Sequence, residues 1–254
     1  MEQYLQWKEL LRAGEGLTFW QEFYVKFYQA FIEADRWKQY LEGVGSTLMV
    51  TALALIIGVI LGVLVAIVRT AHDQQRPGNK NPILGIFNGI CQVYVTIIRG
   101  TPMLVQLLIM GFVIFSTSRE YTAIGILTLG INSGAYVAEI IRGGLMSLDP
   151  GQMEAGRSLG MNYVDTMRFI VIPQAFKAIL PSLGNEFITL LKDTALIYTI
   201  GGEELVYAAK AISTRTYEQM FPLVGTAVIY LALVLVFTWL QSLLERRLRQ
   251  SDRR

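Results

Sequence analysis

Residues 44–68 read VGSTLMVTALALIIGVILGVLVAIV, a run of 25 residues without one charged side chain, and Arg69 ends it. A helix needs about 20 apolar residues to cross the roughly 30 Å of hydrocarbon in a bilayer, so this run is long enough. The composition agrees, because 53% of the 254 residues are hydrophobic and 17% are charged, whereas soluble domains average about 25% charged. The sequence predicts an integral membrane protein.

Further apolar stretches follow this run along the chain. They cover residues 102–115, 121–141, 179–200 and 221–244. The stretch at 102–115 is short for a span, so we expect its helix to begin earlier, near 93–98. The stretch at 179–200 is interrupted by Glu186, Lys192 and Asp193. We therefore expect an all-α membrane protein with about five transmembrane helices.

The distribution of Lys and Arg predicts the orientation of these spans. The loops after the first and third spans, together with the C-terminal tail, contain twelve basic residues: Arg69, Arg76, Lys80, Arg142, Arg157, Arg168, Lys177, Arg246, Arg247, Arg249, Arg253 and Arg254. The loops after the second and fourth spans contain only Arg119, Lys210 and Arg215. Since basic loops stay inside, we expect a cytoplasmic C-terminus and an external N-terminus.

The residue inventory excludes several classes of function. A net charge of +2 is too small for a non-specific nucleic-acid binder. The single cysteine, Cys91, and the single histidine, His72, leave no Cys- or His-rich metal site and no histidine-based triad. An intramembrane enzyme would have almost nothing to build its site from. The chain also lacks a G-x-x-x-x-G-K-[ST] loop, so it cannot cradle ATP in the usual way.

The loop at 142–178 is long and contains the signals of a short helix. Asp149 stands at an N-cap position, and Pro150 suits the first helical residue because its missing N–H needs no partner there. Gly160 is placed to end the helix in the left-handed conformation, and Met153 and Leu159 are its large apolar side chains. So short a helix needs packing for its stability, either on its own protein or on a partner.

This loop resembles the EAA motif of ABC-importer permease subunits. The sequence has Glu154-Ala155-Gly156, then three residues, Gly160, nine residues and Ile170-Val171-Ile172-Pro173. The family pattern is EAA, three residues, G, nine residues and I-x-L-P. The chain departs from it by Gly156 for the second alanine and Ile172 for leucine.

Other stretches are similar to the polar amino-acid branch of that family, which includes histidine, glutamine, arginine and opine transporters. They are IRGTPMLVQL at 98–107, AYVAEIIRGG at 135–144 and LKDTAL at 191–196. The resemblance covers a permease domain at 41–247. It leaves residues 1–40 as an N-terminal extension and residues 248–254 as a basic cytoplasmic tail.

The resemblance implies the transmembrane domain of a type I ABC importer in the bacterial inner membrane. Two such subunits, identical or related, would act with a cytoplasmic ATPase dimer and an external substrate-binding protein. ATP and Mg²⁺ would bind to the ATPase, with no cofactor in this chain, which would be no enzyme itself. The loop would supply the coupling helix that contacts the ATPase, through Asp149, Met153, Glu154, Ala155, Gly156, Leu159 and Gly160.

Polar residues within the spans are costly and mark a transport pathway by default. Those of the third span, Asn132, Ser133, Tyr136 and Glu139, share one helix face at spacings of three and four. Those of the fourth are Asn185, Glu186, Lys192 and Asp193. This set could offer an amino-acid zwitterion both donors and acceptors. The same groups could instead bond neighbouring helices.

Three further hypotheses remain from the sequence. The segment Arg99-Gly100-Thr101-Pro102 is expected to be a cytoplasmic helix entrance, with Arg99 as an anchor. The aromatic stripe from Phe19 to Phe31 predicts an amphipathic helix, lying either at the membrane interface or against the first spans. A stand-alone ion-coupled transporter of small polar solutes is the alternative function, although no inverted repeat supports it.

Overall fold

The computed structural model describes residues 2–75 and 81–251, which contain helices and no strand. The α-helices are α1 (Glu2–Ala13), α2 (Phe19–Phe31), α3 (Arg36–Asp73), α4 (Pro82–Gly100), α5 (Met103–Ile109), α6 (Tyr121–Met146), α7 (Gly151–Ser158), α8 (Tyr163–Thr166), α9 (Ile172–Asp193), α10 (Leu205–Thr216) and α11 (Met220–Ser251). Short 3₁₀ segments are η1 (Glu33–Asp35) and η4 (Thr194–Ile200), and π-helical turns are η2 (Met110–Ile114) and η3 (Met167–Val171).

Four of the described helices, α3, α4, α6 and α11, are long and apolar enough to cross a membrane. α9 has 22 residues, a length of about 33 Å, and packs against both α6 and α11. Its charged side chains keep it out of the purely apolar set. The prediction of an all-α membrane protein with about five spans therefore agrees with these four helices and α9 beside them.

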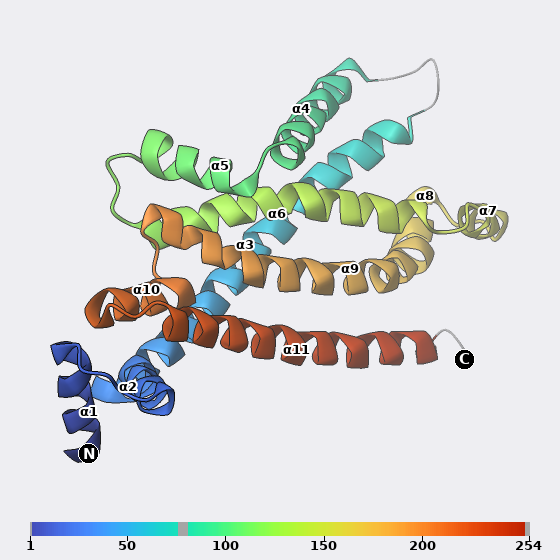
Figure 1. The fold of residues 1–254 in the computed structure, drawn as a ribbon. Helices are drawn as coiled ribbons and strands as arrows, with labels where there is room; N and C mark the ends of the chain where they lie inside the picture. The colour runs from blue at the N-terminus through green and yellow to red at the C-terminus, as the bar shows by residue number, and fades with distance from the viewer. Residues whose placement is uncertain (1, 76–80, 252–254) are drawn as a thin grey trace.

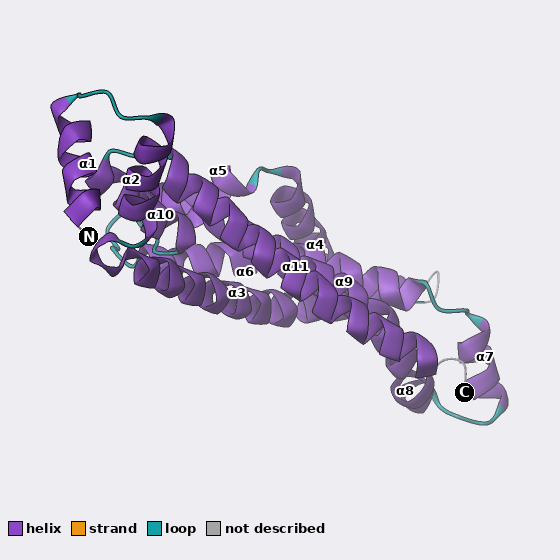
Figure 2. Ribbon diagram, turned by 60° about the horizontal axis from the view of Figure 1, so that its bottom comes forward, coloured by secondary structure: helices purple, strands orange, loops and turns teal. Residues whose placement is uncertain are grey.

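The helices give the molecule two distinct ends (Figures 1 and 2). α7, α8 and the C-terminal end of α11 lie at one end, and α1, α2 and α10 lie at the other. The loop after α6 and the C-terminal end of α11 were predicted to share a side, and the fold places them together. Arg76, Lys80, Arg253 and Arg254, which contribute to the predicted basic side, lie outside the described residues.

The second predicted span is broken rather than continuous. α4 begins at Pro82, well before the expected 93–98, and ends at Gly100. Thr101 is extended (φ −120°, ψ 145°), as expected of a residue that precedes proline. The chain resumes as α5 and η2. Pro102 predicts an interruption of the helix at this position. It gives no information about the length of the helix that precedes the interruption.

The fourth predicted span, at 179–200, also differs from the observed helix. α9 begins at Ile172, seven residues before the expected start, and includes Pro173 in its first turn. The π-helical turn η3 joins α8 to α9 without a break in the helical path, and Pro173 at the first turn of α9 needs no N–H partner. Thr194–Ile200 forms a 3₁₀ segment instead of continuing the helix.

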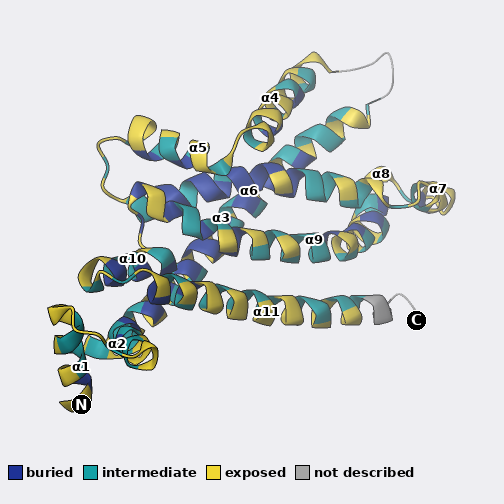
Figure 3. Cartoon of the chain, in the orientation of Figure 1, coloured by how far each residue is buried: buried dark blue, intermediate teal, exposed yellow. Residues whose placement is uncertain are grey.

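The core lies where α3 crosses α6, and buried residues concentrate on these two helices (Figure 3). A Cβ atom on Gly58 would lie 2.7 Å from Ser133 Oγ, and one on Gly130 would lie 2.7 Å from Ile57. Gly62 faces Val137 in the same way. Glycines thus let the two backbones approach closely, as small residues do between membrane helices. Gly143, further along α6, has nothing within 4 Å of its Cβ position and takes no part in this close approach.

Gly62→Ala is expected to destabilise the α3–α6 crossing. Its Cβ would lie 2.6 Å from Val137 Cβ and 2.9 Å from the backbone nitrogen of Ala138, so the helices must separate. Such overpacking costs about 1–3 kcal/mol. Thermal unfolding in detergent measures this, with Gly143→Ala as the control. That control should be neutral or stabilising because it adds only helix propensity. Equal midpoints for the two variants would contradict the packing argument.

A buried carboxylate between η4 and α10, unsuspected from the sequence, joins α10 to α11. Glu204 is 1% exposed, and its oxygens accept from the backbone N–H groups of Val206 (2.7 Å) and Tyr207 (2.8 Å). The Tyr230 hydroxyl on α11 donates to it at 2.9 Å. Burial raises the pKa of Glu204, and these donors oppose the rise. Glu204 caps α10 and ties it to α11.

Candidate functional site

The interruption between α4 and α5 leaves backbone carbonyls at the end of α4 without helical partners. Gln106 on α5 compensates for part of this loss. Its Nε2 donates to the carbonyl oxygen of Ile98 at 2.8 Å and to that of Thr101 at 3.2 Å. The residues Arg99 to Gln106 therefore form a stable polar break inside an otherwise apolar segment.

The break lies beside the middle of α6. Asn132 Nδ2 donates to Gln106 Oε1 at 3.0 Å, and the Arg99 guanidinium lies 5.3 Å from the centre of the Tyr136 ring. A helix does begin at Arg99–Pro102, since Pro102 is the N-cap of α5, but the segment connects two helices beside the middle of α6 instead of standing at the start of a span. Discontinuous helices near the middle of a membrane are typical of substrate sites in transporters.

A cluster of charged side chains adjoins the break. The Glu139 carboxylate pairs with Arg69 of α3, with Arg99 at 3.9 Å and with Arg142 at 3.7 Å. Arg142 also lies 3.8 Å from Asp73. The side chains of Arg69 and Glu139 are 14% and 25% exposed. Three guanidinium groups and two carboxylates leave this cluster with one excess positive charge.

A cavity of about 330 Å³ opens among α3, α4 and α6 at this cluster. It is lined by Arg69, Gln92, Val95, Thr96, Arg99 and Glu139. Arg99 contributes to the charged cluster from α4, and 43% of its side chain is accessible. A small solute in this cavity would meet cationic, anionic and neutral polar groups together.

The other predicted pathway residues lie elsewhere. The Ser133 hydroxyl donates to Glu186 Oε1 at 2.7 Å and so joins α6 to α9. Asn185 accepts from Gln241 of α11 at 3.0 Å. Lys192 is exposed and Asp193 half-buried at the end of α9. The structure therefore brings Asn132, Tyr136 and Glu139 to the break and leaves the α9 residues apart from it.

Sequence reasoning missed Arg69 and Gln106 and assigned Arg99 to anchoring. Arg69 gave no signal beyond ending the apolar run, and only the fold brings it to Glu139. Gln106 and Arg99 belong to the IRGTPMLVQL stretch, so the sequence identified the motif that contains them. It did not predict their contacts with Asn132, Tyr136 and Glu139. Among residues 2–75 and 81–251, no three His, Cys, Asp or Glu side chains gather to hold a metal ion.

The helix predicted in the loop after α6 is present as α7, but it begins one residue later than expected, with Pro150 rather than Asp149 at the N-cap position. Asp149 Oδ1 accepts from the Gly151 N–H at 2.8 Å. Gly160 has φ +81°, the left-handed conformation that glycine adopts at low cost. The Met161 N–H donates to Gly156 O at 3.1 Å and the Gly160 N–H to Arg157 O at 2.9 Å, which is the Schellman pattern.

One face of α7 packs on the chain, and the other is free. Gly156 is buried, and a Cβ there would lie 2.6 Å from Thr166 Cγ2 of α8. This close approach explains why the smallest residue stands at this position of the motif. Met153 is half-buried, whereas Glu154, Ala155 and Leu159 are exposed, Leu159 to 79%.

Comparison with known proteins shows similarity over most of the chain. The family described as "Binding-protein-dependent transport system inner membrane component" matches residues 82–250. The putative glutamine transport system permease protein GlnP of Rickettsia typhi is 34% identical over 230 residues, which cover 89% of this chain and 98% of the relative. The arginine transport system permease protein ArtQ of Bacillus subtilis is 36% identical over 217 residues, covering 84% and 93%.

Solved structures agree with this similarity. A crystal structure of an amino acid ABC transporter with histidines has a chain 41% identical to this one, with a TM-score of 0.74, covering 83% of this chain and 94% of that one. An inward-facing MetNI methionine ABC transporter shares the fold at 20% identity, with a TM-score of 0.71, covering 86% and 99%. The chain therefore belongs to the family of binding-protein-dependent transport system inner membrane components, the non-catalytic permease subunits of ABC importers.

Proposed function

We propose that the chain forms the translocation pathway of an ATP-driven importer of polar amino acids. Its similarity to glutamine and arginine permeases over nearly their whole length carries this proposal. The cavity beside the α4–α5 break supports it, because an amino acid presents a carboxylate and an ammonium group. A stand-alone ion-coupled transporter is set aside, since transport in this family depends on a binding protein.

The substrate pathway runs past the polar break in this proposal. Arg99 is placed to attract the substrate carboxylate, and Glu139 to attract its ammonium group. Tyr136, 38% exposed, covers the other side of Arg99. Asn132 holds the break in position through Gln106. The proposed pathway also includes polar residues of α6 and α9 that lie further from the cavity: Ser133, Asn185, Glu186, Lys192 and Asp193.

Coupling to ATP hydrolysis occurs through α7. Asp149 and Gly160 stand at the two ends of the helix, and Gly156 lets it pack closely on α8. The surface that contacts the ATPase consists of Met153, Glu154, Ala155 and Leu159. Support comes from the continuous helical path of α8, η3 and α9, which would transmit a movement of α7 into the bundle. Gln174 of α9 adds a second link, since its Nε2 donates to Gln152 Oε1 of α7 at 3.2 Å.

The remaining partners follow from this arrangement. A second permease subunit, identical or related, would complete the pathway, and an external binding protein would deliver the substrate. The end that contains α7 and the C-terminus would face the cytoplasm, with the N-terminus outside, in a bacterial inner membrane. ATP and Mg²⁺ would reside in the ATPase.

Co-purification tests the ATPase partnership directly. A tagged wild-type chain, extracted from its own membranes in mild detergent, should bring a cytoplasmic ATPase with it, and Glu154→Arg should lose most of that ATPase. Glu9→Arg, a charge reversal on exposed α1 at the opposite end, serves as the control and should retain the ATPase. A well-folded wild-type chain that never captures an ATPase, even after cross-linking, would contradict the proposal.

A further inference from the structure

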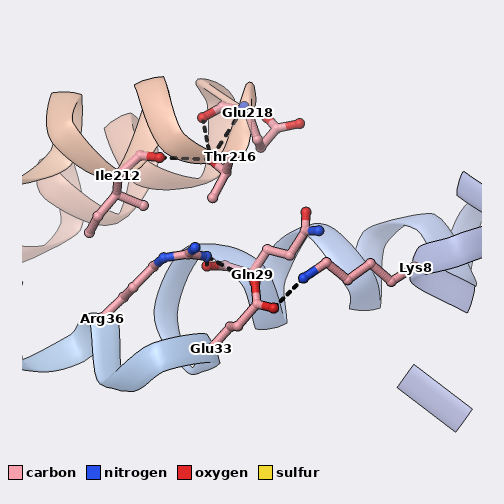
Figure 4. Close-up of polar contacts among 7 residues, drawn as sticks. All are labelled: Lys8, Gln29, Glu33, Arg36, Ile212, Thr216 and Glu218. Carbon is pink, nitrogen blue, oxygen red and sulfur yellow. Dashed lines mark hydrogen bonds and ion pairs between the residues drawn. The ribbon is translucent and has the colours of Figure 1, made fainter. Parts of the chain in front are cut away.

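The first two helices form a hairpin, and the Arg36 guanidinium at the start of α3 donates to the Gln29 carbonyl oxygen of α2 (Figure 4). Lys8 of α1 pairs with Glu33, just after α2. Lys26 of α2 lies 3.3 Å from Glu218, in the turn between α10 and α11. The hairpin, residues 2–35, thus has a defined position against the membrane helices.

Aromatic rings place the hairpin at the ends of two spans. The rings of Phe23 and Phe221 lie 4.9 Å apart, and those of Phe31 and Tyr40 lie 5.4 Å apart, which joins α2 to α11 and α3. The charge-free run of α3 begins at Val44, eight residues after Arg36. Eight helical residues rise about 12 Å, which carries the start of α3 through the headgroup layer.

The start of α2 carries an exposed aromatic surface. Phe19 is 71% exposed and Trp20 is 74% exposed. Both rings contact Phe23, whose ring packs on Phe221 of α11, so the exposed surface reaches the start of α11, where Met220 is 56% exposed. An apolar aromatic surface continuous with lipid-facing helices is typical of the bilayer interface, where Trp and Tyr rings gather.

A cavity of about 440 Å³ lies between the two helices of the hairpin. Its lining is aromatic and uncharged: Gln3, Tyr4, Trp7, Trp20, Gln21 and Tyr24. The Trp7 and Tyr24 rings meet nearly edge to face, with centres 6.0 Å apart. Faces of Trp and Tyr attract organic cations, and the Lys8 ammonium, paired with Glu33, already lies 5.6 Å from the centre of the Tyr4 ring. The rings of Trp7, Trp20 and Tyr24 have no such cation over them among the described residues, and the lining itself contains no charged side chain.

We propose that this cavity binds the ammonium headgroup of a phospholipid whose acyl chains lie along the exposed aromatic face of α2. The aromatic ring faces favour the ammonium group over an anionic group. The exposed aromatic surface of α2 adjoins the spanning helices, which favours a lipid over a soluble ligand. The hairpin is then an interfacial anchor with a headgroup preference.

Native mass spectrometry of the full-length protein, with any subunits that accompany it, tests this. Micelles containing equal amounts of phosphatidylethanolamine and phosphatidylglycerol are the probe, and the ratio of the two lipids retained is the readout. The double variant Trp7→Leu/Tyr24→Leu should lower the retained ratio about fivefold, the range expected for loss of a partly exposed cation–π site. Trp7→Phe/Tyr24→Phe keeps the rings and should retain most of the preference.

The control is Trp239→Leu, which alters an exposed tryptophan on the spanning part of α11 and should leave the ratio unchanged. An unchanged ratio in the double leucine variant would overturn the proposal. So would an equal loss of both lipids, since the surface would then bind acyl chains without reading the headgroup. Loss of binding to an external substrate-binding protein, with lipid retention intact, would make the hairpin a protein-docking surface instead.

Discussion

Gly160→Val is expected to lower amino-acid uptake at least about tenfold while the protein still inserts and folds. Gly160 has φ +81° at the end of α7, where a β-branched side chain costs about 1–3 kcal/mol of strain. Relief of that strain would remove the hydrogen bonds that end the helix and would tilt α7 on α8. Uptake of labelled substrate and ATPase activity, measured in proteoliposomes that contain the whole complex, would show hydrolysis without transport.

Gly160→Asn is the matched control, because asparagine tolerates the left-handed conformation better than other non-glycine residues. It should retain most of the uptake. Glu154→Arg should also lower uptake, but by a different route: it reverses the exposed charge without disturbing the end of the helix, so the ATPase is lost from the complex and hydrolysis falls together with uptake. Normal uptake in both Gly160→Val and Glu154→Arg would remove α7 from the coupling role.

Glu139→Gln is expected to reduce uptake by about tenfold, the equivalent of ~1.4 kcal/mol. The carboxylate lies among Arg69, Arg99 and Arg142, and its neutralisation leaves guanidinium groups without their partner in a partly buried site. Loss of one member of a buried pair costs several kcal/mol, but the partial exposure here reduces that effect. Uptake kinetics with a panel of amino acids provide the measurement.

A change in KM or selectivity at an unchanged unfolding temperature would support a contact with substrate, whereas a fall in unfolding temperature alone would indicate a structural ion pair. Glu42→Gln, a neutralisation of an exposed carboxylate on α3, is the control and should leave uptake intact. Wild-type kinetics in Glu139→Gln would exclude Glu139 from the pathway.

The sequence predicted the position of α7 well because the determinants of this helix are local. The Asp149 side chain, a proline at the start and a glycine at the end act on their immediate neighbours, so their spacing alone places α7. The same is true of the long spans, since 25 charge-free residues have no other stable environment than the bilayer core. The start of α6 at Tyr121 was likewise predicted from hydropathy.

The polar site was less accessible from the sequence. Asn132 and Glu139 were found because polar groups are rare in spans, but the sequence left open whether they meet substrate or other helices. Their partners Gln106 and Arg69 lie 26 and 70 residues away along the chain, and no local rule connects positions so distant. For the same reason, the sequence placed Thr101–Pro102 at the entrance of a helix, whereas these residues lie beside the middle of α6.

The sequence by itself determined the membrane-spanning character of the chain, its family and the presence of α7, since hydropathy and helix-end signals act within a few residues. Only the tertiary structure decided which polar side chains share the cavity, where the broken helix lies beside α6, and that residues 2–35 fold onto the ends of α3 and α11. These features depend on close packing between helices, such as the glycine crossing of α3 and α6, and that packing is defined only when the whole bundle is assembled.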